Sequence, residues 1–255
     1  MAAKKKQKTQ VPEELSRLRF TKTDTEICIK ACLILKHSHE SSQALLAAYR
    51  LARFARMLLK DKNRETESYN IRGMSTDEEQ DLLRSMLVTA ASGLDAMTKQ
   101  LIRDTLPKLI QIDTDALLGL EKFVRKKIKG EIEDESYEGS TFLARILVAT
   151  SIQKQLIEDY INYLTKGSLQ SSEELVKITE ALALPQGEVN IDHRTLKPIF
   201  EARNKIIHEL DINLDADRRN RNVRSEGKMK NYTNILIGLA ERILHAVDQK
   251  IKKIT

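Results

Sequence analysis

Apolar residues recur along most of this chain at the three- and four-residue spacing of amphipathic helices. Only nine glycines and four prolines occur in 255 residues, which favours long helices over a turn-rich β fold. The spacing predicts helices over residues 23–35, 41–59, 75–107, 113–128, 141–164, 171–182, 198–211 and 232–254. The sequence therefore predicts an all-α helical bundle of about seven to eight helices.

The polar stretches between these helices predict the domain organisation. Residues 1–20 begin with a lysine-rich run and are predicted to form a flexible basic tail. Residues 21–70 are expected to form an N-terminal helical hairpin, with a polar linker over 61–73. Ser75 and Glu78 then have the spacing of a capping box, in which each side chain satisfies a backbone N–H at a helix start. A larger helical domain is predicted over residues 75–255.

The helix that begins at Ser75 carries a run of small residues at Ala90, Ala91, Ser92 and Gly93. Little side-chain bulk at that level allows another helix, or a two-fold mate, to approach closely. Asp95 follows and has two interpretations. It is either the partner of a buried arginine, with Arg203 as the candidate, or a solvent-facing acid paired with Lys99 four residues later.

The helix predicted over 198–211 has one apolar face, and Arg203 projects onto the middle of it. Asn204 and His208 are four residues apart, so they are neighbours on the adjoining edge. Burying a charge within an apolar stripe costs free energy unless an opposite charge or hydrogen-bond acceptors pair with it. Arg203 therefore pairs with a carboxylate of another helix, extends its head to water, or faces a phosphate across an interface between two copies of the helix. His208 is alternatively an ordinary exposed histidine near a helix end.

The run Arg203-Asn204, three residues, His208 resembles the motif of HEPN domains, which is arginine, a polar residue, three variable residues and histidine. The late position of the helix, the acidic Glu209 and Asp211 after the motif, and the small-residue-rich helix over 82–101 are also similar to that family. The resemblance implies a HEPN-like bundle that pairs two-fold, with a composite site at the dimer seam. Arg203, Asn204 and His208 would be catalytic, and Asp95 and Glu209 would support them.

By this resemblance the chain is expected to be a metal-independent endoribonuclease that acts as a toxin or an antiphage defence effector. Its expected partners are RNA, a second copy of the chain, and an antitoxin or sensor protein; no cofactor and no metal are expected. Arginine suits phosphate through its bidentate fork, and an imidazole suits proton transfer to and from ribose oxygens. The alternatives are a non-catalytic helical module that binds RNA or protein, and a helical adaptor without a nucleic-acid role.

The net charge of +6 and pI near 9.1 are compatible with a polyanionic partner, although 31% charged residues of both signs also suit an ordinary surface. Aromatic residues make up 4% and Trp is absent, which argues against a platform that stacks single-stranded bases. Residues 217–230 are predicted to form a mobile basic loop. Its arginines are either candidate RNA-phosphate contacts or the solvated balance of acidic stretches; they are Arg218, Arg219, Arg221 and Arg224.

Cys28 and Cys32 are four residues apart and are followed by His37 and His39. This spacing matches no standard zinc site, and two buried thiols in a reducing compartment are the expected arrangement. We see neither a signal peptide nor an apolar run long enough for a membrane helix, so a cytoplasmic location is expected.

Overall fold

The computed structural model describes residues 14–20, 22–62, 75–130, 139–213 and 221–254. These residues form nine α-helices, one short 3-10 helix and no strand, which confirms the predicted all-α class. The elements are η1 (Glu26–Cys28), α1 (Ile29–Lys62), α2 (Asp77–Ile112), α3 (Thr114–Ile128), α4 (Gly139–Leu147), α5 (Ile152–Thr165), α6 (Ser172–Ala181), α7 (Gln186–Val189), α8 (His193–Glu209) and α9 (Glu226–Ile254). None of the described helices is long and apolar enough to cross a membrane.

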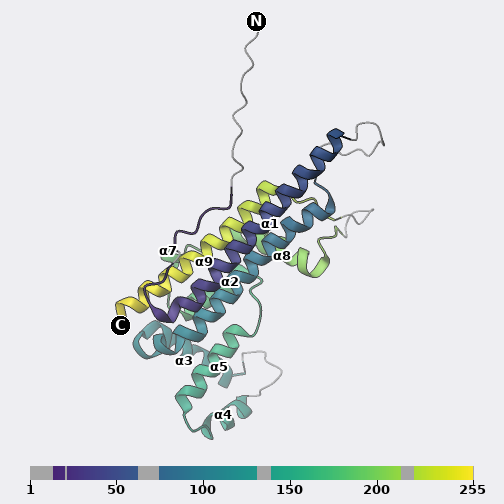
Figure 1. The fold of residues 1–255 in the computed structure, drawn as a ribbon. Coiled ribbons are helices and arrows are strands. Elements are labelled where there is room, and N and C mark those ends of the chain that lie inside the picture. Colours follow the sequence, from purple (N-terminus) through teal and green to yellow (C-terminus); the bar gives the residue numbers. More distant parts are fainter. Residues whose placement is uncertain (1–13, 21, 63–74, 131–138, 214–220, 255) are drawn as a thin grey trace.

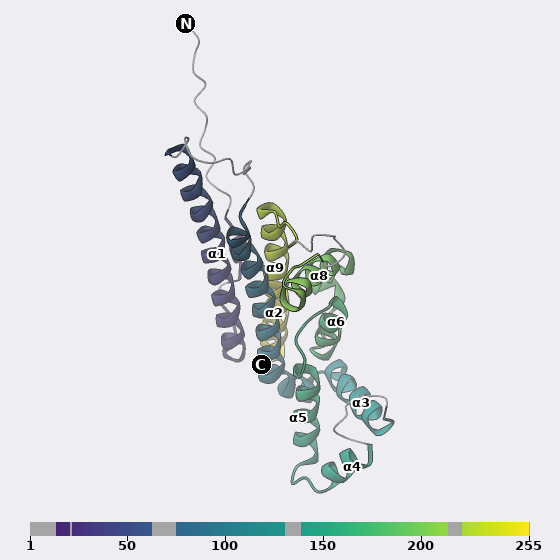
Figure 2. The same cartoon turned by 90° about the vertical axis from the view of Figure 1, so that its right-hand side faces the viewer.

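Three long helices, α1, α2 and α9, lie side by side and form the body of the molecule (Figure 1). Helix α2 packs against both α1 and α9, and its core-facing residues are almost fully buried along its whole length. Helices α6 and α8 lie on the flank of this body opposite α1, while α3, α4 and α5 gather at one end (Figure 2). The motif helix α8 packs against α2 and α6.

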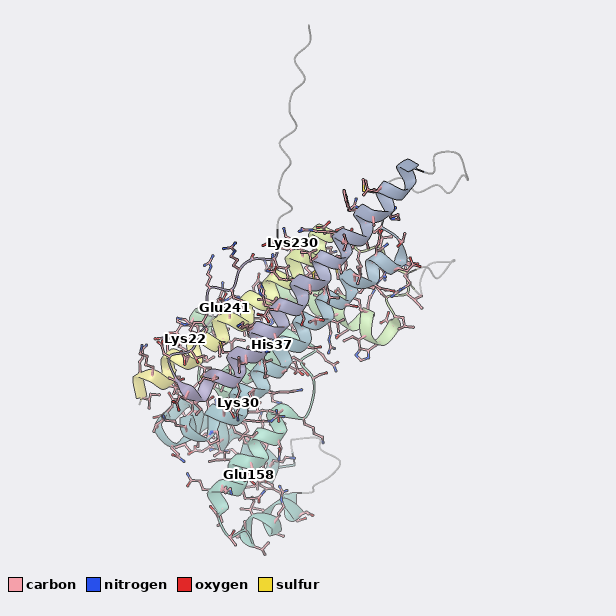
Figure 3. The ribbon with its side chains drawn as sticks, in the orientation of Figure 1. Lys22, Lys30, His37, Glu158, Lys230 and Glu241 are labelled. Atoms are coloured by element: carbon pink, nitrogen blue, oxygen red, sulfur yellow. The ribbon has the colours of Figure 1, made fainter. Side chains whose placement is uncertain are left out.

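The predicted N-terminal hairpin is not present, because α1 is one continuous helix that includes residues 36–41. Those residues are polar, which suggested a break, yet Ser38 and His39 are buried and the neighbouring His37 points outward (Figure 3). Ser38 lies against Gly93 of α2, and its hydroxyl donates to the carbonyl of Thr89 at 3.1 Å. The small-residue run of α2 thus lies against a neighbouring helix, as predicted, and the close approach leaves room for only a small side chain opposite Gly93.

The start of the described chain is held by the last helix. Asp248 of α9 is fully buried and accepts hydrogen bonds from the backbone N–H groups of Asp24 and Thr25 at 2.7 and 3.0 Å. Leu15 is also buried, and Ser16 donates its N–H to Asn234 of α9 at 3.0 Å. Residues 14–20, which we assigned to the flexible tail, therefore pack on the bundle; residues 1–13 lie outside the described part.

Several helix boundaries differ from the predicted ones. The capping box at the start of α2 uses Thr76 and Glu79, one residue later than expected. Pro107 lies inside α2 instead of ending it, because burial of Leu106, Leu109 and Ile110 outweighs one lost backbone hydrogen bond. The helix predicted over 141–164 is divided into α4 and α5, with Ser151 capping α5. Residues 185–187, predicted as a turn, begin the short helix α7.

Both cysteines are buried and neither forms a disulfide, as expected. Burial raises the pKa of the Cys28 thiol to about 11, so this thiol stays protonated at neutral pH. Within the described ranges, no group of three or more histidine, cysteine, aspartate or glutamate side chains is arranged to hold a metal ion.

We predict that Gly93→Ala destabilises the fold by about 2 kcal/mol, because the added methyl group would overlap the side chain of Ser38. Urea unfolding followed by circular dichroism measures this loss. Adding Ser38→Gly should restore most of the stability. Gly187→Ala is the control, since a Cβ there meets nothing within 4 Å, and its effect should stay within about 0.5 kcal/mol. Equal effects at the two glycines would contradict the proposed close approach.

Candidate functional site

Helix α8 carries the motif and begins earlier than predicted, at His193, where the side chain of Asp192 caps its first turn. Ile199 and Phe200 are buried, as the apolar stripe predicted. The stripe does not stay buried to the end of the helix, because Ile207 is 39% exposed and Leu210 is 66% exposed. The last turn of α8 therefore presents apolar side chains to its surroundings.

Arg203 lies on the buried side of α8 and is only 8% exposed, as predicted. One of its terminal nitrogens, Nη1, donates to Oδ1 of the adjacent Asn204 at 2.9 Å. Its Nε is buried without an acceptor, and no carboxylate of the described residues pairs with the guanidinium. The charge of Arg203 is therefore left without a counter-charge by the described part of its own chain.

Asn204 connects the motif to the segment between α5 and α6. While its Oδ1 accepts from Arg203, its Nδ2 donates to the carbonyl of Gln170 at 3.3 Å. Asp95 of α2 binds the same segment, because it accepts a hydrogen bond from the N–H of Leu169 at 2.9 Å. Asp95 also forms an ion pair with Lys99 at 2.8 Å. Of the two interpretations of Asp95, the structure shows the pairing with Lys99, but Asp95 is partly buried and not solvent-facing as that interpretation expected. Asp95 reaches the motif only through the backbone of residues 169–170.

His208 and Glu209 are both exposed at the end of α8, and neither side chain has a hydrogen bond or ion pair within the described residues. Five residues separate Arg203 from His208, which places them about 140° apart around the helix. One copy of the chain therefore does not direct the guanidinium and the imidazole at a common point. The structure brings Arg203 together with Asn204, and it leaves His208 accessible.

The turn after α8 is fixed by a buried ion cluster. Leu210 and Asp211 both adopt left-handed backbone conformations, with φ of 50° and 61°. Asp211 is fully buried and accepts from Nε of Arg84 and Nε of Arg224, each at 2.8 Å. Burial alone would raise the pKa of Asp211, but the hydrogen bonds from Arg224 and Arg84 outweigh it and hold that pKa below its usual range. The cluster stabilises a turn that non-glycine residues rarely adopt.

Arg221 and Arg224 both form ion pairs with carboxylates of the same chain. Arg221 pairs with Asp81 of α2 at 2.7 Å and donates to the carbonyl of Leu210 at 3.1 Å, while Arg224 pairs with Asp211. The loop that contains them ends earlier than predicted, since α9 begins at Glu226. Arg218 and Arg219 lie outside the described residues. Phosphate contacts by Arg221 and Arg224 stay a prediction, and both groups already have carboxylate partners.

Sequence reasoning missed Arg84 and Asp81, which join α2 to this turn. Arg84 is 2% exposed, lies among the buried residues of α2, and donates to Asp81 at 2.9 Å as well as to Asp211. The signal for Arg84 was the same as for Arg203, a cation on an apolar stripe. Its partner Asp211 was not identifiable, because 127 residues separate the two.

Comparisons of this chain with models of known protein families, with curated proteins and with solved structures found no match.

Arg203 and Arg84 are both buried, but their different partners predict opposite effects of substitution on the free energy of unfolding. Arg203→Met removes a charge that has no counter-charge among the described residues, so the free energy of unfolding should stay the same or rise by about 1 kcal/mol. Arg84→Met leaves Asp211 with one of its two arginines, so it should lower that free energy by about 3 kcal/mol. Urea denaturation of both variants makes the comparison. A loss at Arg203 as large as that at Arg84 would mean that a carboxylate does neutralise Arg203.

Asp211→Asn should destabilise the protein by about 3 kcal/mol at pH 7, because the buried Arg84 and the partly buried Arg224 lose their shared partner. Since folding lowers the pKa of Asp211, its contribution is present above the ordinary carboxyl pKa of about 4 and is lost as pH falls through the folded value. The gap between wild type and variant should therefore narrow between pH 7 and pH 3. Glu209→Gln, an exposed neighbour, should change stability by less than about 0.5 kcal/mol. A gap that is independent of pH would contradict the role of Asp211.

Proposed function

We propose that this chain is a HEPN-type, metal-independent endoribonuclease, and that it acts in the cytoplasm as a toxin or antiphage defence effector. One observation supports the proposal most directly: the guanidinium of Arg203 is buried, and no carboxylate of the described residues pairs with it. Such a group favours an anion, and an RNA phosphate is an anion whose oxygens match the guanidinium fork. The accessible imidazole of His208 on the same helix supplies a group for proton transfer.

The proposed reaction uses the nucleophile that RNA itself carries. A general base takes the proton of the ribose 2′-hydroxyl, and its oxygen forms a bond to the adjacent phosphorus. The bond from phosphorus to the 5′ oxygen breaks, and a general acid protonates that oxygen. The products are a 2′,3′-cyclic phosphate and a 5′-hydroxyl. Arg203 would stabilise the additional negative charge on the phosphate, and His208 would act as acid or base.

A second copy of the chain completes the proposed site. Arg203 and His208 of one chain point about 140° apart, so a shared cleft needs the two residues to come from different copies or from two adjoining helices. Ile207, Leu210 and Val223 are exposed apolar residues around the end of α8, and such a surface favours contact with another protein surface. Two-fold pairing of α8 would cover these residues and place two Arg203–His208 sets at one seam.

In this proposal Asn204 positions Arg203, since its amide oxygen holds Nη1 and its amide nitrogen is fixed on the Gln170 carbonyl. That same arrangement is the observation that favours the second candidate function, a non-catalytic helical module that binds RNA or a partner protein. An Asn204 amide occupied on both sides is better suited to holding Arg203 for binding than to acting on a substrate. An antitoxin or sensor protein would be a natural partner in either case.

We predict that His208→Ala and Arg203→Met each lower RNA cleavage at least 100-fold, because each removes a group that acts in the transition state. The assay uses the full-length protein with single-stranded RNA in excess EDTA, and the cleaved ends are tested for a 2′,3′-cyclic phosphate. His37→Ala is the control, since His37 is an exposed histidine on α1, away from the motif helix, and should leave cleavage unchanged.

Cleavage retained by His208→Ala would remove the nuclease proposal. Salt-sensitive RNA binding by the wild-type protein without cleavage, lost in Arg203→Met, would support the binding module instead. Sedimentation of the wild-type protein tests the pairing, and Leu210→Glu should convert a dimer to a monomer and reduce cleavage in parallel.

A further inference from the structure

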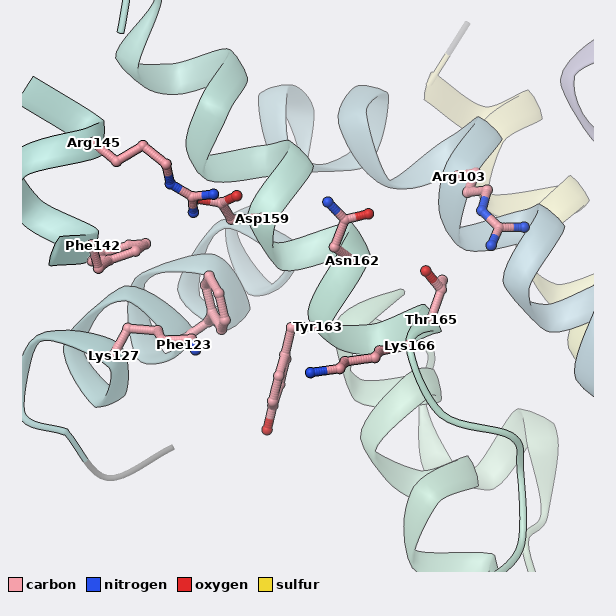
Figure 4. Close-up of a pocket in the computed structure, with 10 residues that line it drawn as sticks. All are labelled: Arg103, Phe123, Lys127, Phe142, Arg145, Asp159, Asn162, Tyr163, Thr165 and Lys166. Atoms are coloured by element: carbon pink, nitrogen blue, oxygen red, sulfur yellow. The ribbon is translucent and has the colours of Figure 1, made fainter. Parts of the chain in front are cut away.

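A cavity of about 500 Å³ opens where α3, α4 and α5 meet, but several of its groups already have partners in the chain. Arg145 forms an ion pair with Asp159 at 2.5 Å (Figure 4). The ring of Tyr163 packs beside that of Phe123, and Nζ of Lys177 lies 3.6 Å from its centroid. The outer face of α1 differs from this cavity, because its large apolar side chains are left uncovered by the described part of the chain.

An apolar stripe runs along the outer face of the second half of α1. Leu51, Phe54 and Leu58 are 68%, 59% and 50% exposed, and Ala44 and Ala47 continue the stripe as exposed residues. Successive members are three or four positions apart in alternation, which is the spacing by which two helices pack along each other. This end of α1 lies at the edge of the molecule and extends beyond α2 and α9 (Figure 1, Figure 2).

The inward face of the same turns of α1 is charged. Arg50 pairs with Glu226 of α9 at 2.7 Å, and Arg56 pairs with Glu79 of α2 at 2.6 Å. An ordinary surface helix has the opposite arrangement, with its apolar side toward the bundle and its charges toward water. An exposed apolar surface of this kind is typical of a contact with another protein.

Charged residues limit the stripe on its N-terminal side. His37 and Glu40 lie 3.4 Å apart on the outer face, and their side chains are 74% and 54% exposed. Leu33 lies beyond them on the same face and is 49% exposed, but it is separated from the stripe by these two residues. The apolar stripe is therefore limited to residues 44–58, which span about 21 Å at 1.5 Å per residue.

The order of small and large side chains makes the stripe complementary to a second copy of itself. In an antiparallel pair with a two-fold axis between Leu51 and Phe54, Leu51 of each copy faces Phe54 of the other. Ala47 then faces Leu58, so a small residue leaves room for a large one. A parallel pair would instead place Ala47 against Ala47 and Phe54 against Phe54, with a void at one level and crowding at the other.

We propose that two copies of this chain associate through the outer faces of their α1 helices, with the helices antiparallel. One helix pair of this length is a small interface, and interfaces below about 1,200 Å² are typical of weak association. We therefore expect the contact to form at roughly tens of micromolar protein. The contact involves no residue of α8 and does not depend on the proposed RNA cleavage. Where α8 also pairs, the α1 contact would link two such pairs into a larger assembly.

Sedimentation velocity of the full-length Leu210→Glu variant tests the α1 contact without pairing through α8. This variant should be a monomer at about 1 µM and should form a dimer as its concentration rises to about 200 µM. Adding Phe54→Glu should weaken that dimer more than tenfold, because the pair would bury an unpaired charge. Phe54 is exposed in the single chain, so its substitution should leave the circular dichroism spectrum unchanged.

Leu33→Glu is the matched control, since Leu33 is an exposed leucine on the same face of α1 but outside the stripe, and it should associate like its parent. RNA cleavage by Phe54→Glu in the otherwise wild-type chain should be unchanged at low micromolar concentration. This readout separates the α1 contact from the nuclease proposal. A Leu210→Glu variant that stays monomeric at 200 µM would overturn the α1 contact, as would equal weakening by Leu33→Glu and Phe54→Glu.

Disulfide cross-linking tests the antiparallel orientation. Chains with Ala47→Cys and chains with Leu58→Cys should form a covalent dimer when they are mixed under oxidising conditions, and neither should do so alone. The native Cys28 and Cys32 are buried, so the wild-type chain should give no cross-link. A covalent dimer formed by Ala47→Cys chains alone would indicate a parallel pair and would contradict the proposed orientation.

Discussion

The candidate site depends on the buried positive charge of Arg203, which no carboxylate among the described residues neutralises. Arg203 is enclosed by α8 and its neighbours, and the only partner among the described residues is the neutral amide of Asn204. Desolvating a guanidinium costs several kcal/mol, which a neutral acceptor only partly offsets. The rest of the site is arranged around this group, since Asn204 is fixed on Gln170 and the segment of Gln170 is fixed by Asp95. These contacts hold Arg203 in one position in spite of that cost.

Much of the fold could be predicted from spacing alone, as α3, α6 and α9 show. Helix α3 begins after Asp113 and α6 begins after Ser171, because the capping residues at both positions are unambiguous. The break expected in α1 was wrong for a tertiary reason. Ser38 looks like a loop residue in sequence, but opposite Gly93 the two helices approach so closely that a small polar residue is the one that packs. The helix propensity of the residues around Ser38 does not show how closely α1 and α2 approach each other.

The candidate site was predictable in part for the same reason. The position of Arg203 on the buried face follows from helical periodicity, and burial confirms it. The choice between Lys99 and Arg203 as the partner of Asp95 depended on where the segment around Leu169 lies, which periodicity does not determine. The arginines of the predicted basic loop show the same limit. Composition indicated phosphate contacts, whereas Arg221 and Arg224 pair with Asp81 and Asp211, which only the folded chain brings near them.

The contact between Asp248 of α9 and the backbone just before η1 has a consequence for how the chain assembles. Asp248 lies 223 residues after Thr25, so this contact joins two segments that are far apart in the sequence. Helices α1 and α2 are neighbours in sequence and can associate while the ribosome is still adding residues. The backbone at Asp24 and Thr25, in contrast, gains its acceptor only after Asp248 has been synthesised. A chain cut short before Asp248 would leave the N–H groups of Asp24 and Thr25 without this acceptor, and a segment released in this way is where proteases cut first.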